Sequence, residues 1–126
     1  MSKIINTPNA PTPIGPYSQA VWAGDVLFLS GQIAIDPKTS SIVDGSLEEE
    51  THQVMKNIAA VLKAAGLDLS NIIKSSIFLK DMGSFSTVNK IYGSYFEGDF
   101  PARETVEVAR LPKDVRVEIS IIAHKG

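Results

Sequence analysis

Two spacings of apolar residues alternate along the chain and predict where helices and strands lie. Residues 46–65 carry apolar side chains three and four positions apart, the spacing of a helix with one face on a core. Ser46 and Glu49 open this segment as a capping box, and Gly66 follows it where helices often end in a left-handed residue. Residues 84–97 show the same spacing before another glycine and predict a second helix. The apolar stripe of the first helix consists of Leu47, Val54, Ile58, Val61, Leu62 and Ala65.

Shorter apolar runs with turn residues on both sides predict strands. Residues 17–23 and 26–30 are separated only by Gly24 and Asp25, a two-residue loop typical of a hairpin. Residues 72–79 have the pattern of a buried strand. Both faces of the hairpin are apolar, so each needs a cover. The expected register pairs Ala20 with Leu29, Trp22 with Leu27, Val21 with Phe28 and Ala23 with Val26.

The elements follow one another as strand, strand, helix, strand, helix, strand, strand. This order predicts an α+β fold in which two helices pack on one face of a single-layer mixed sheet. Four prolines between residues 8 and 16 predict a stiff surface arm, because each proline removes a backbone donor and fixes φ. A length of 126 residues fits one domain, so residues 1–126 are expected to form a single unit.

The last two predicted strands, residues 101–108 and 115–119, carry charged residues among apolar neighbours and are joined by a short loop. They are expected to pair as a hairpin, in one of two registers that place opposite sets of side chains on each face. Pairing Val108 with Val115 is favoured, because it sets apolar residues against each other and Glu107 against Arg116. This register gathers four polar residues on one patch: Arg103, Thr105, Glu118 and Ser120.

Arg103 and Glu118 are the strongest candidates for chemistry. A guanidinium grips a carboxylate with two parallel hydrogen bonds, and a carboxyl group beside it can hold a water or pass a proton. An unpaired carboxylate in an apolar strand is costly, so Glu118 needs a reason to be there. The alternative is a structural ion pair between Arg103 and Glu118, and the residues alone favour it, because most charged pairs on sheets are structural.

Other polar residues admit both a site role and a structural role. Gly31, after Ser30 at the end of an apolar strand, suits either a close approach to a ligand or a β-bulge. Tyr17 follows Gly-Pro and can place its hydroxyl over a pocket or pack in the hairpin. Asn89 is either a pocket edge or a solvated helix residue. Both histidines, His52 and His124, are interpreted as surface residues, and no metal site is expected.

Composition narrows the classes of function. The formal net charge is -2 and the charged fraction is 21%, so the chain has no basic footprint for nucleic acid or an anionic membrane. It contains no cysteine, which excludes disulfides and a cysteine nucleophile. No apolar run approaches the length of a membrane span, and no signal-peptide pattern opens the chain. A cytoplasmic location is therefore the expectation.

Several blocks of the sequence together resemble the reactive intermediate deaminase family (RidA, formerly YjgF). The resemblance covers nearly the whole chain, and the combination of blocks is more specific than any one of them. Glu104 and Thr105 depart from the family pattern, which often has Ser and Cys there. The matching blocks are Ile14-Gly15-Pro16-Tyr17-Ser18-Gln19-Ala20, Ser30-Gly31-Gln32-Ile33, Val88-Asn89 with Tyr92, Pro101-Ala102-Arg103, Val106 to Asp114 and Val117-Glu118-Ile119.

The resemblance implies a chorismate-mutase-like trimeric fold with a site at each subunit interface. It implies hydrolysis of 2-aminoacrylate and related enamine or imine acids to a 2-keto acid and ammonia, without cofactor or metal. Arg103 would hold the substrate carboxylate with backbone donors near Thr105 and Gly31, and Glu118 would place water and move a proton. Tyr17, Ser30 and Asn89 would line the pocket.

Two further functions remain open on the sequence. The chain could bind small carboxylates without turning them over, as members of this fold without the arginine suggest. Ribonuclease activity has also been attached to some members, but this acidic chain lacks a basic track and a catalytic histidine pair. Glu104 is expected to point away from Arg103, to the opposite face of its strand.

Overall fold

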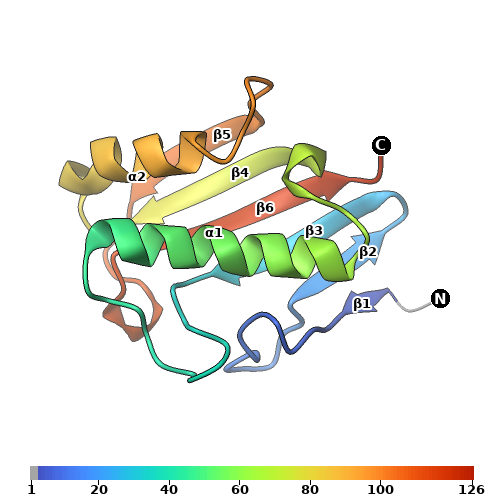
Figure 1. The fold of residues 1–126 in the computed structure, drawn as a ribbon, viewed down its shortest axis with the longest axis horizontal. Coiled ribbons are helices and arrows are strands. Elements are labelled where there is room, and N and C mark those ends of the chain that lie inside the picture. Colours follow the sequence, from blue (N-terminus) through green and yellow to red (C-terminus); the bar gives the residue numbers. More distant parts are fainter. Residues whose placement is uncertain (1–2) are drawn as a thin grey trace.

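The computed structural model describes residues 3–126 as one six-stranded mixed sheet with two helices on the same face (Figure 1). The sheet order is β1-β2-β3-β6-β4-β5. The predicted α+β architecture is therefore confirmed. The strands are β1 (Ile4–Ile5), β2 (Ala20–Ala23), β3 (Val26–Gln32), β4 (Ile72–Leu79), β5 (Ala102–Glu107) and β6 (Val117–His124), and the helices are α1 (Leu47–Ala64) and α2 (Phe85–Gly93).

The first helix begins and ends where its sequence predicts. The Ser46 hydroxyl accepts a hydrogen bond from the Glu49 backbone N–H at 3.0 Å, which is the N-cap half of the expected box. Gly66 follows with a φ of +79°, a conformation that costs glycine little. Apolar residues of the stripe, including Val54, Ile58 and Val61, are fully buried against the sheet.

The second helix is shorter than predicted and ends at Gly93 rather than residue 97. Beyond it the chain tightens: the Tyr95 N–H donates to the Tyr92 carbonyl and the Phe96 N–H to the Gly93 carbonyl, each three residues back. Gly93 has a lower helix propensity than the residues before it. The Ser94 hydroxyl also binds the Ile91 carbonyl at 2.6 Å, which favours a turn over another helical turn.

The first hairpin has the predicted register, with Ala20 opposite Leu29 and Val21 opposite Phe28. Its two faces have different fates in one chain. Ala20 and Leu29 are buried in the core beneath α1, whereas Phe28 on the other face remains 49% exposed. The helix-free face of the sheet is thus apolar and uncovered within a single copy.

The predicted pairing of the last two strands is wrong. β5 and β6 do not touch as neighbours, because β4 lies between them: β5 runs parallel to β4, and β6 runs antiparallel to it. The reason is that β4, α2 and β5 form a βαβ unit, whose crossover helix sets two parallel strands side by side. The loop that was taken for a hairpin turn instead passes the end of β4, where the Val108 N–H binds the Leu79 carbonyl and the Lys80 N–H binds the Arg116 carbonyl.

This topology separates the two candidate residues. Ser75 of β4 is the partner of Arg103, and Phe78 of β4 is the partner of Glu118. Because positions three apart on a strand face opposite sides, Arg103 lies on the helix side of the sheet and Glu118 on the helix-free side. The single polar patch expected from the hairpin register does not exist in one chain.

The ion pair expected between Glu107 and Arg116 is also absent from the described residues. Arg116 instead binds the buried Glu50 of α1, with 2.6 Å between its Nε and Glu50 Oε1. Glu50 also accepts from the backbone N–H groups of Arg116 and Val117, so it ties the start of β6 to α1. Glu107 accepts from the Met82 N–H.

Within residues 3–126, no helix is both long enough and apolar enough to cross a membrane.

Candidate active site

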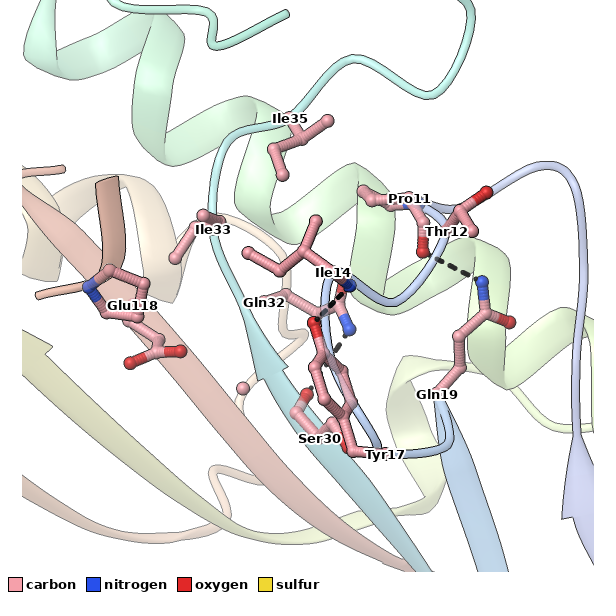
Figure 2. A pocket seen from close by; sticks show the side chains of 12 residues that line it. Pro11, Thr12, Ile14, Tyr17, Gln19, Ser30, Gln32, Ile33, Ile35 and Glu118 are labelled. Atoms are coloured by element: carbon pink, nitrogen blue, oxygen red, sulfur yellow. Dashed lines mark hydrogen bonds between the residues drawn. The ribbon is translucent and has the colours of Figure 1, made fainter. Parts of the chain in front are cut away.

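One cavity opens on the helix-free side, next to Glu118, and we call it the Glu118 cavity. Its volume is about 420 Å³. Figure 2 shows the Glu118 carboxylate on one side and Tyr17 and Ser30 on the other, with Ile14 and Ile33 between them. Three segments distant in sequence therefore meet here. The remaining lining residues are Pro11, Thr12, Gln19, Gly31, Gln32, Ile35 and Pro112.

Gly31 lies in a β-bulge that brings its backbone against Glu118. Leu29 pairs with Ile121 and Gln32 with Ile119, so two residues of β3 oppose one residue of β6. A Cβ atom at Gly31 would lie 2.5 Å from Glu118 Oε2, closer than real contacts allow. The bulge, one of the two alternatives for Gly31, is therefore present, and the close approach that the structure shows is to the Glu118 side chain rather than to a ligand.

The Glu118 carboxylate is half-buried and has no hydrogen-bond or ion-pair partner among residues 3–126. Burial removes water from the charged form and raises the pKa of Glu118 above its usual value. A carboxyl group with a raised pKa, at the edge of a cavity, is suited to accept and return a proton.

The hydroxyl groups of Ser30 and Tyr17 each form a hydrogen bond with a backbone group. The Ser30 hydroxyl donates to the Ser18 carbonyl at 2.5 Å. The Tyr17 hydroxyl oxygen accepts from the Ile14 N–H at 3.2 Å, and the Tyr17 side chain is 48% exposed. Tyr17 is therefore not packed inside the hairpin, which was the alternative to a pocket position.

A second hollow, the Arg103 pocket, lies on the helix side between α2 and the start of β5. Its volume is about 450 Å³. The Arg103 Nη1 donates to Asn89 Oδ1 at 2.6 Å, so Asn89 is not merely solvated. The guanidinium carbon lies 5.7 Å from the Phe85 ring centre and 5.4 Å from that of Tyr92, within cation–π range. The pocket is lined by Asn89, Tyr92, Gly93, Phe100, Pro101 and Arg103.

Arg103 makes no ion pair with any carboxylate of the described residues, which contradicts the structural ion pair with Glu118. A guanidinium has five N–H donors, and a single one binds Asn89. The two rings and the amide fix the plane of the guanidinium, while most of its N–H donors have no partner among the described residues. Such an arrangement suits capture of an external carboxylate.

The aromatic support beneath Arg103 was missed by the sequence analysis. The Tyr92 hydroxyl donates to the Ser75 Oγ at 2.8 Å inside the protein, and burial raises the pKa of Tyr92. Phe85 and Tyr92 lie on the apolar side of α2, and their spacing in the sequence gives no sign of the residue that stacks on them. Position in the βαβ unit supplies that partner.

Thr105 and Glu104 take opposite sides of β5. Thr105 shares the face of Arg103 but lines neither cavity, and its Oγ1 is buried with no hydrogen-bond partner among residues 3–126. Glu104 points to the helix-free side as expected, 2.8 Å from the Ser76 hydroxyl and 3.2 Å from Lys74 Nζ. The hydrogen bond from Ser76 and the ammonium of Lys74 lower the pKa of Glu104.

His52 is half-buried rather than on the surface, with its Nδ1 2.7 Å from the Tyr95 hydroxyl. His124 is also partly buried at the end of β6. Over residues 3–126, no group of three or more His, Cys, Asp or Glu side chains is placed to hold a metal ion.

The predicted site residues therefore form two groups. Tyr17, Ser30, Gly31 and Glu118 meet at the Glu118 cavity, whereas Asn89 and Arg103 meet at the Arg103 pocket. The two groups lie on opposite faces of one sheet, so one small molecule cannot touch both within a single chain.

Comparison with known proteins places the chain among close relatives. The family model described as Endoribonuclease L-PSP matches residues 7–125. A RutC family protein of Pyrococcus horikoshii is 54% identical over 125 residues, covering 99% of each chain. The 2-iminobutanoate/2-iminopropanoate deaminase of Mus musculus is 48% identical over 124 residues, covering 98% of this chain and 92% of that protein.

The fold is likewise similar to solved structures. The crystal structure of Escherichia coli TdcF with bound serine superposes with a TM-score of 0.94 at 41% identity, covering 99% of this chain and 100% of that one. The likeness thus extends over the whole described sheet and both helices.

Proposed function

Because the chain belongs to the endoribonuclease L-PSP family, which includes the YjgF and RidA proteins, we propose that it is an enamine/imine deaminase. Its substrates would be 2-imino acids such as 2-iminobutanoate and 2-iminopropanoate, the tautomer of 2-aminoacrylate, and its products a 2-keto acid and ammonia. The mouse relative carries that activity in its name. The observation that carries the proposal is the Arg103 guanidinium, which lies over two rings and has no carboxylate partner within residues 3–126.

Arg103 is proposed to bind the substrate carboxylate. Its planar fork matches a carboxylate with two parallel hydrogen bonds, and Asn89 fixes the fork by accepting from Nη1. Backbone N–H groups near Thr105 and Gly31 would add further donors. This clamp would hold the imine carbon in a fixed place, which converts attack by water into a step between oriented partners.

Glu118 is proposed to move the protons of the reaction. Water adds to the carbon of the protonated imine, and one water proton passes to the Glu118 carboxylate as the C–O bond forms, which leaves a neutral carbinolamine. The Glu118 carboxyl group returns that proton to the amine nitrogen and the C–N bond breaks. The hydroxyl proton then passes through Glu118 to the departing ammonia as the C=O bond of the keto acid forms. A raised pKa favours this exchange, because the group is then closer to balance between its two protonation states.

The two groups of residues would meet across an interface between copies, as a homotrimer with a site at each seam. In this arrangement the Glu118 cavity of one copy faces the Arg103 pocket of its neighbour, with Tyr17, Ser30 and Asn89 along the walls. The exposed apolar side chains on the helix-free face, Val21, Phe28 and Val106, support this assembly, because monomers rarely leave such a face uncovered.

A coupled assay tests the activity. A pyridoxal-phosphate dehydratase generates 2-aminoacrylate from serine, and keto-acid formation is followed with and without the purified protein. The proposal expects faster formation than the uncatalysed hydrolysis, in proportion to protein added. A rate equal to the uncatalysed one at every protein concentration would refute it.

Binding without turnover is a second candidate, supported by the bound serine of the E. coli relative. Calorimetry with serine and 2-oxobutanoate separates the two: tight binding with no effect in the coupled assay favours a binder. Because the family is named for an endoribonuclease, RNA cleavage should be assayed on the same protein. The net charge of -2 gives little attraction for RNA, so we expect any cleavage to disappear on further purification.

A further inference from the structure

The Gln19 side chain is buried, at 2% exposure, and its carboxamide is turned toward the proline-rich arm. Its Oε1 accepts from the Thr7 N–H at 2.7 Å. Its Nε2 donates to the Thr7 and Pro11 carbonyls at 3.0 Å each and lies 3.4 Å from the Ala10 carbonyl. The Gln19 carboxamide therefore contacts three residues of this segment, Thr7, Ala10 and Pro11.

The arm has few other means to hold its shape. Prolines at four positions between 8 and 16 have no N–H to donate, and residues 8–16 belong to no strand or helix. The bonds inside the arm are short-range, such as the Asn9 N–H to the Thr7 hydroxyl and the Tyr17 N–H to the Gly15 carbonyl. Ala10 packs in the core, but its single methyl group does not fix the direction in which the chain runs on either side of it.

The same arm forms one wall of the Glu118 cavity. Figure 2 shows the Gln19 carboxamide reaching the Pro11 carbonyl, with Ile14 and Tyr17 between that bond and Glu118. Ile14 and Tyr17 are bound to each other and are both about half exposed. Their place over the cavity thus depends on how the arm is held behind them.

We propose that Gln19 is a positioning residue for substrate binding: its amide clamps residues 7–11 so that Ile14 and Tyr17 stand opposite Glu118. This inference rests on the proposed function only in assuming that the Glu118 cavity receives the small carboxylate. Gln19 itself would act through the arm, because its amide is occupied by backbone groups.

Gln19→Met keeps the volume and burial of the side chain while removing its amide bonds. We expect KM for the imine to rise about tenfold or more while kcat changes less than about threefold, the signature of lost uniform binding. Hydrogen exchange at the Thr7 amide should accelerate as well, since its acceptor is gone. If Gln19→Met does not fold, Gln19→Asn keeps the amide on a shorter stem and should show the same changes in smaller size.

Asn71→Ala is the matched control. Asn71 also uses its amide to join two segments, accepting from the Asp68 N–H and donating to the His124 carbonyl, but it lines neither cavity. It should lower stability and leave KM unchanged. A Gln19→Met protein with wild-type KM, or with unchanged exchange at Thr7, would overturn the proposal.

Binding of 2-oxobutanoate, measured by calorimetry on the same proteins, separates this inference from the deaminase proposal. If the wild-type protein binds the keto acid but hydrolyses no imine, the proposed deaminase activity is refuted. In that case, tenfold weaker binding of the keto acid by Gln19→Met would still support the positioning role of Gln19, and binding equal to that of wild type would refute it.

Discussion

Arg103 and Glu118, on opposite faces of the sheet, have opposite electrostatic surroundings. On the helix side, Arg103 is an ion supported by two rings and an amide, all from the unit formed by β4, α2 and β5. On the helix-free side, Glu118 has no hydrogen-bond or ion-pair partner among the described residues, and its burial disfavours the charged form. One face holds a fixed charge and the other favours a change of charge, which agrees with the separate tasks proposed for them, substrate binding and proton transfer.

The construction of the two pockets differs as well. The residues that line the Arg103 pocket and the two rings that stack on Arg103 all lie between positions 85 and 103. The Glu118 cavity draws on the arm, on the β3 bulge, on Pro112 and on β6, so segments a hundred residues apart meet there. The Arg103 pocket should therefore survive local changes in the rest of the chain, whereas the Glu118 cavity depends on distant supports such as Gln19.

Removing the fixed charge should have the largest effect on activity. Arg103→Ala is expected to lose about 100-fold or more in kcat/KM, because a charge-assisted pair of hydrogen bonds to substrate is gone. Arg103→Lys should be nearly as poor, since an ammonium cannot form the planar fork. Circular dichroism and Tm should stay close to wild type, because Arg103 is exposed. Wild-type activity in Arg103→Lys would contradict the clamp.

Crowding Glu118 should have the next largest effect. In Gly31→Ala, the new methyl group would lie 2.5 Å from Glu118 Oε2, so the carboxylate or the bulge must move. We expect a loss of about tenfold or more in kcat but a stability loss of only about 1 kcal/mol or less in urea unfolding, because the contact is with the flexible end of the Glu118 side chain. A double-mutant cycle with Glu118→Ala isolates the clash. In the Glu118→Ala background, Gly31→Ala should cost clearly less stability, and an equal cost would mean that the contact does not matter.

The cost of charging Glu118 should be visible as a pH dependence of stability. Because its folded pKa is raised, Glu118 contributes stability that is present below the unfolded pKa of about 4.3 and lost as the pH rises through the folded pKa. Glu118→Gln stays neutral throughout. It should be more stable than wild type at pH 8, by less than about 1 kcal/mol after solvent screening, and equally stable near pH 4. Urea unfolding at both pH values checks this prediction. A Glu118→Gln variant that is less stable than wild type at pH 8 would show that the negative charge of Glu118 stabilises the folded state.

The smallest expected effect concerns Thr105, beside the clamp. Its buried hydroxyl has no hydrogen-bond partner in the part of the chain that the structure describes, so Thr105→Val should be neutral or should stabilise by up to about 1 kcal/mol. The matched control is Thr51→Val, since the buried Thr51 hydroxyl donates to the Leu47 carbonyl at 2.8 Å. That change should destabilise by about 1 kcal/mol. Equal losses in the two variants would mean that Thr105 has found a partner.

Local patterns in the sequence predicted local structure well. The α1 cap at Ser46, the left-handed Gly66 and the β2–β3 register follow from residues within a few positions of one another. The partner of β5 did not follow from such patterns. A short loop made a hairpin with β6 the natural expectation, while the pairing with β4 depends on how α2 packs across the sheet.

The candidate site shows the same division. Arg103 and Glu118 stand out because each is charged in an unusual local setting. Their separation by β4 could not be seen, because facing depends on which strands are neighbours. Gln19 and Tyr92 were missed for a related reason: each acts on a backbone or side chain distant in sequence, and neither breaks its own local pattern.

The central claim is that one site takes Arg103 from one copy and Glu118 from another. Mixing two inactive variants, Arg103→Ala and Glu118→Gln, by unfolding and refolding them together tests it most directly. If the site spans two copies, random assembly at equal amounts gives about a quarter of the sites both wild-type residues, so about a quarter of wild-type activity should return. If both residues of a site belong to one chain, every chain lacks one of them, and the refolded mixture would stay as inactive as either variant alone.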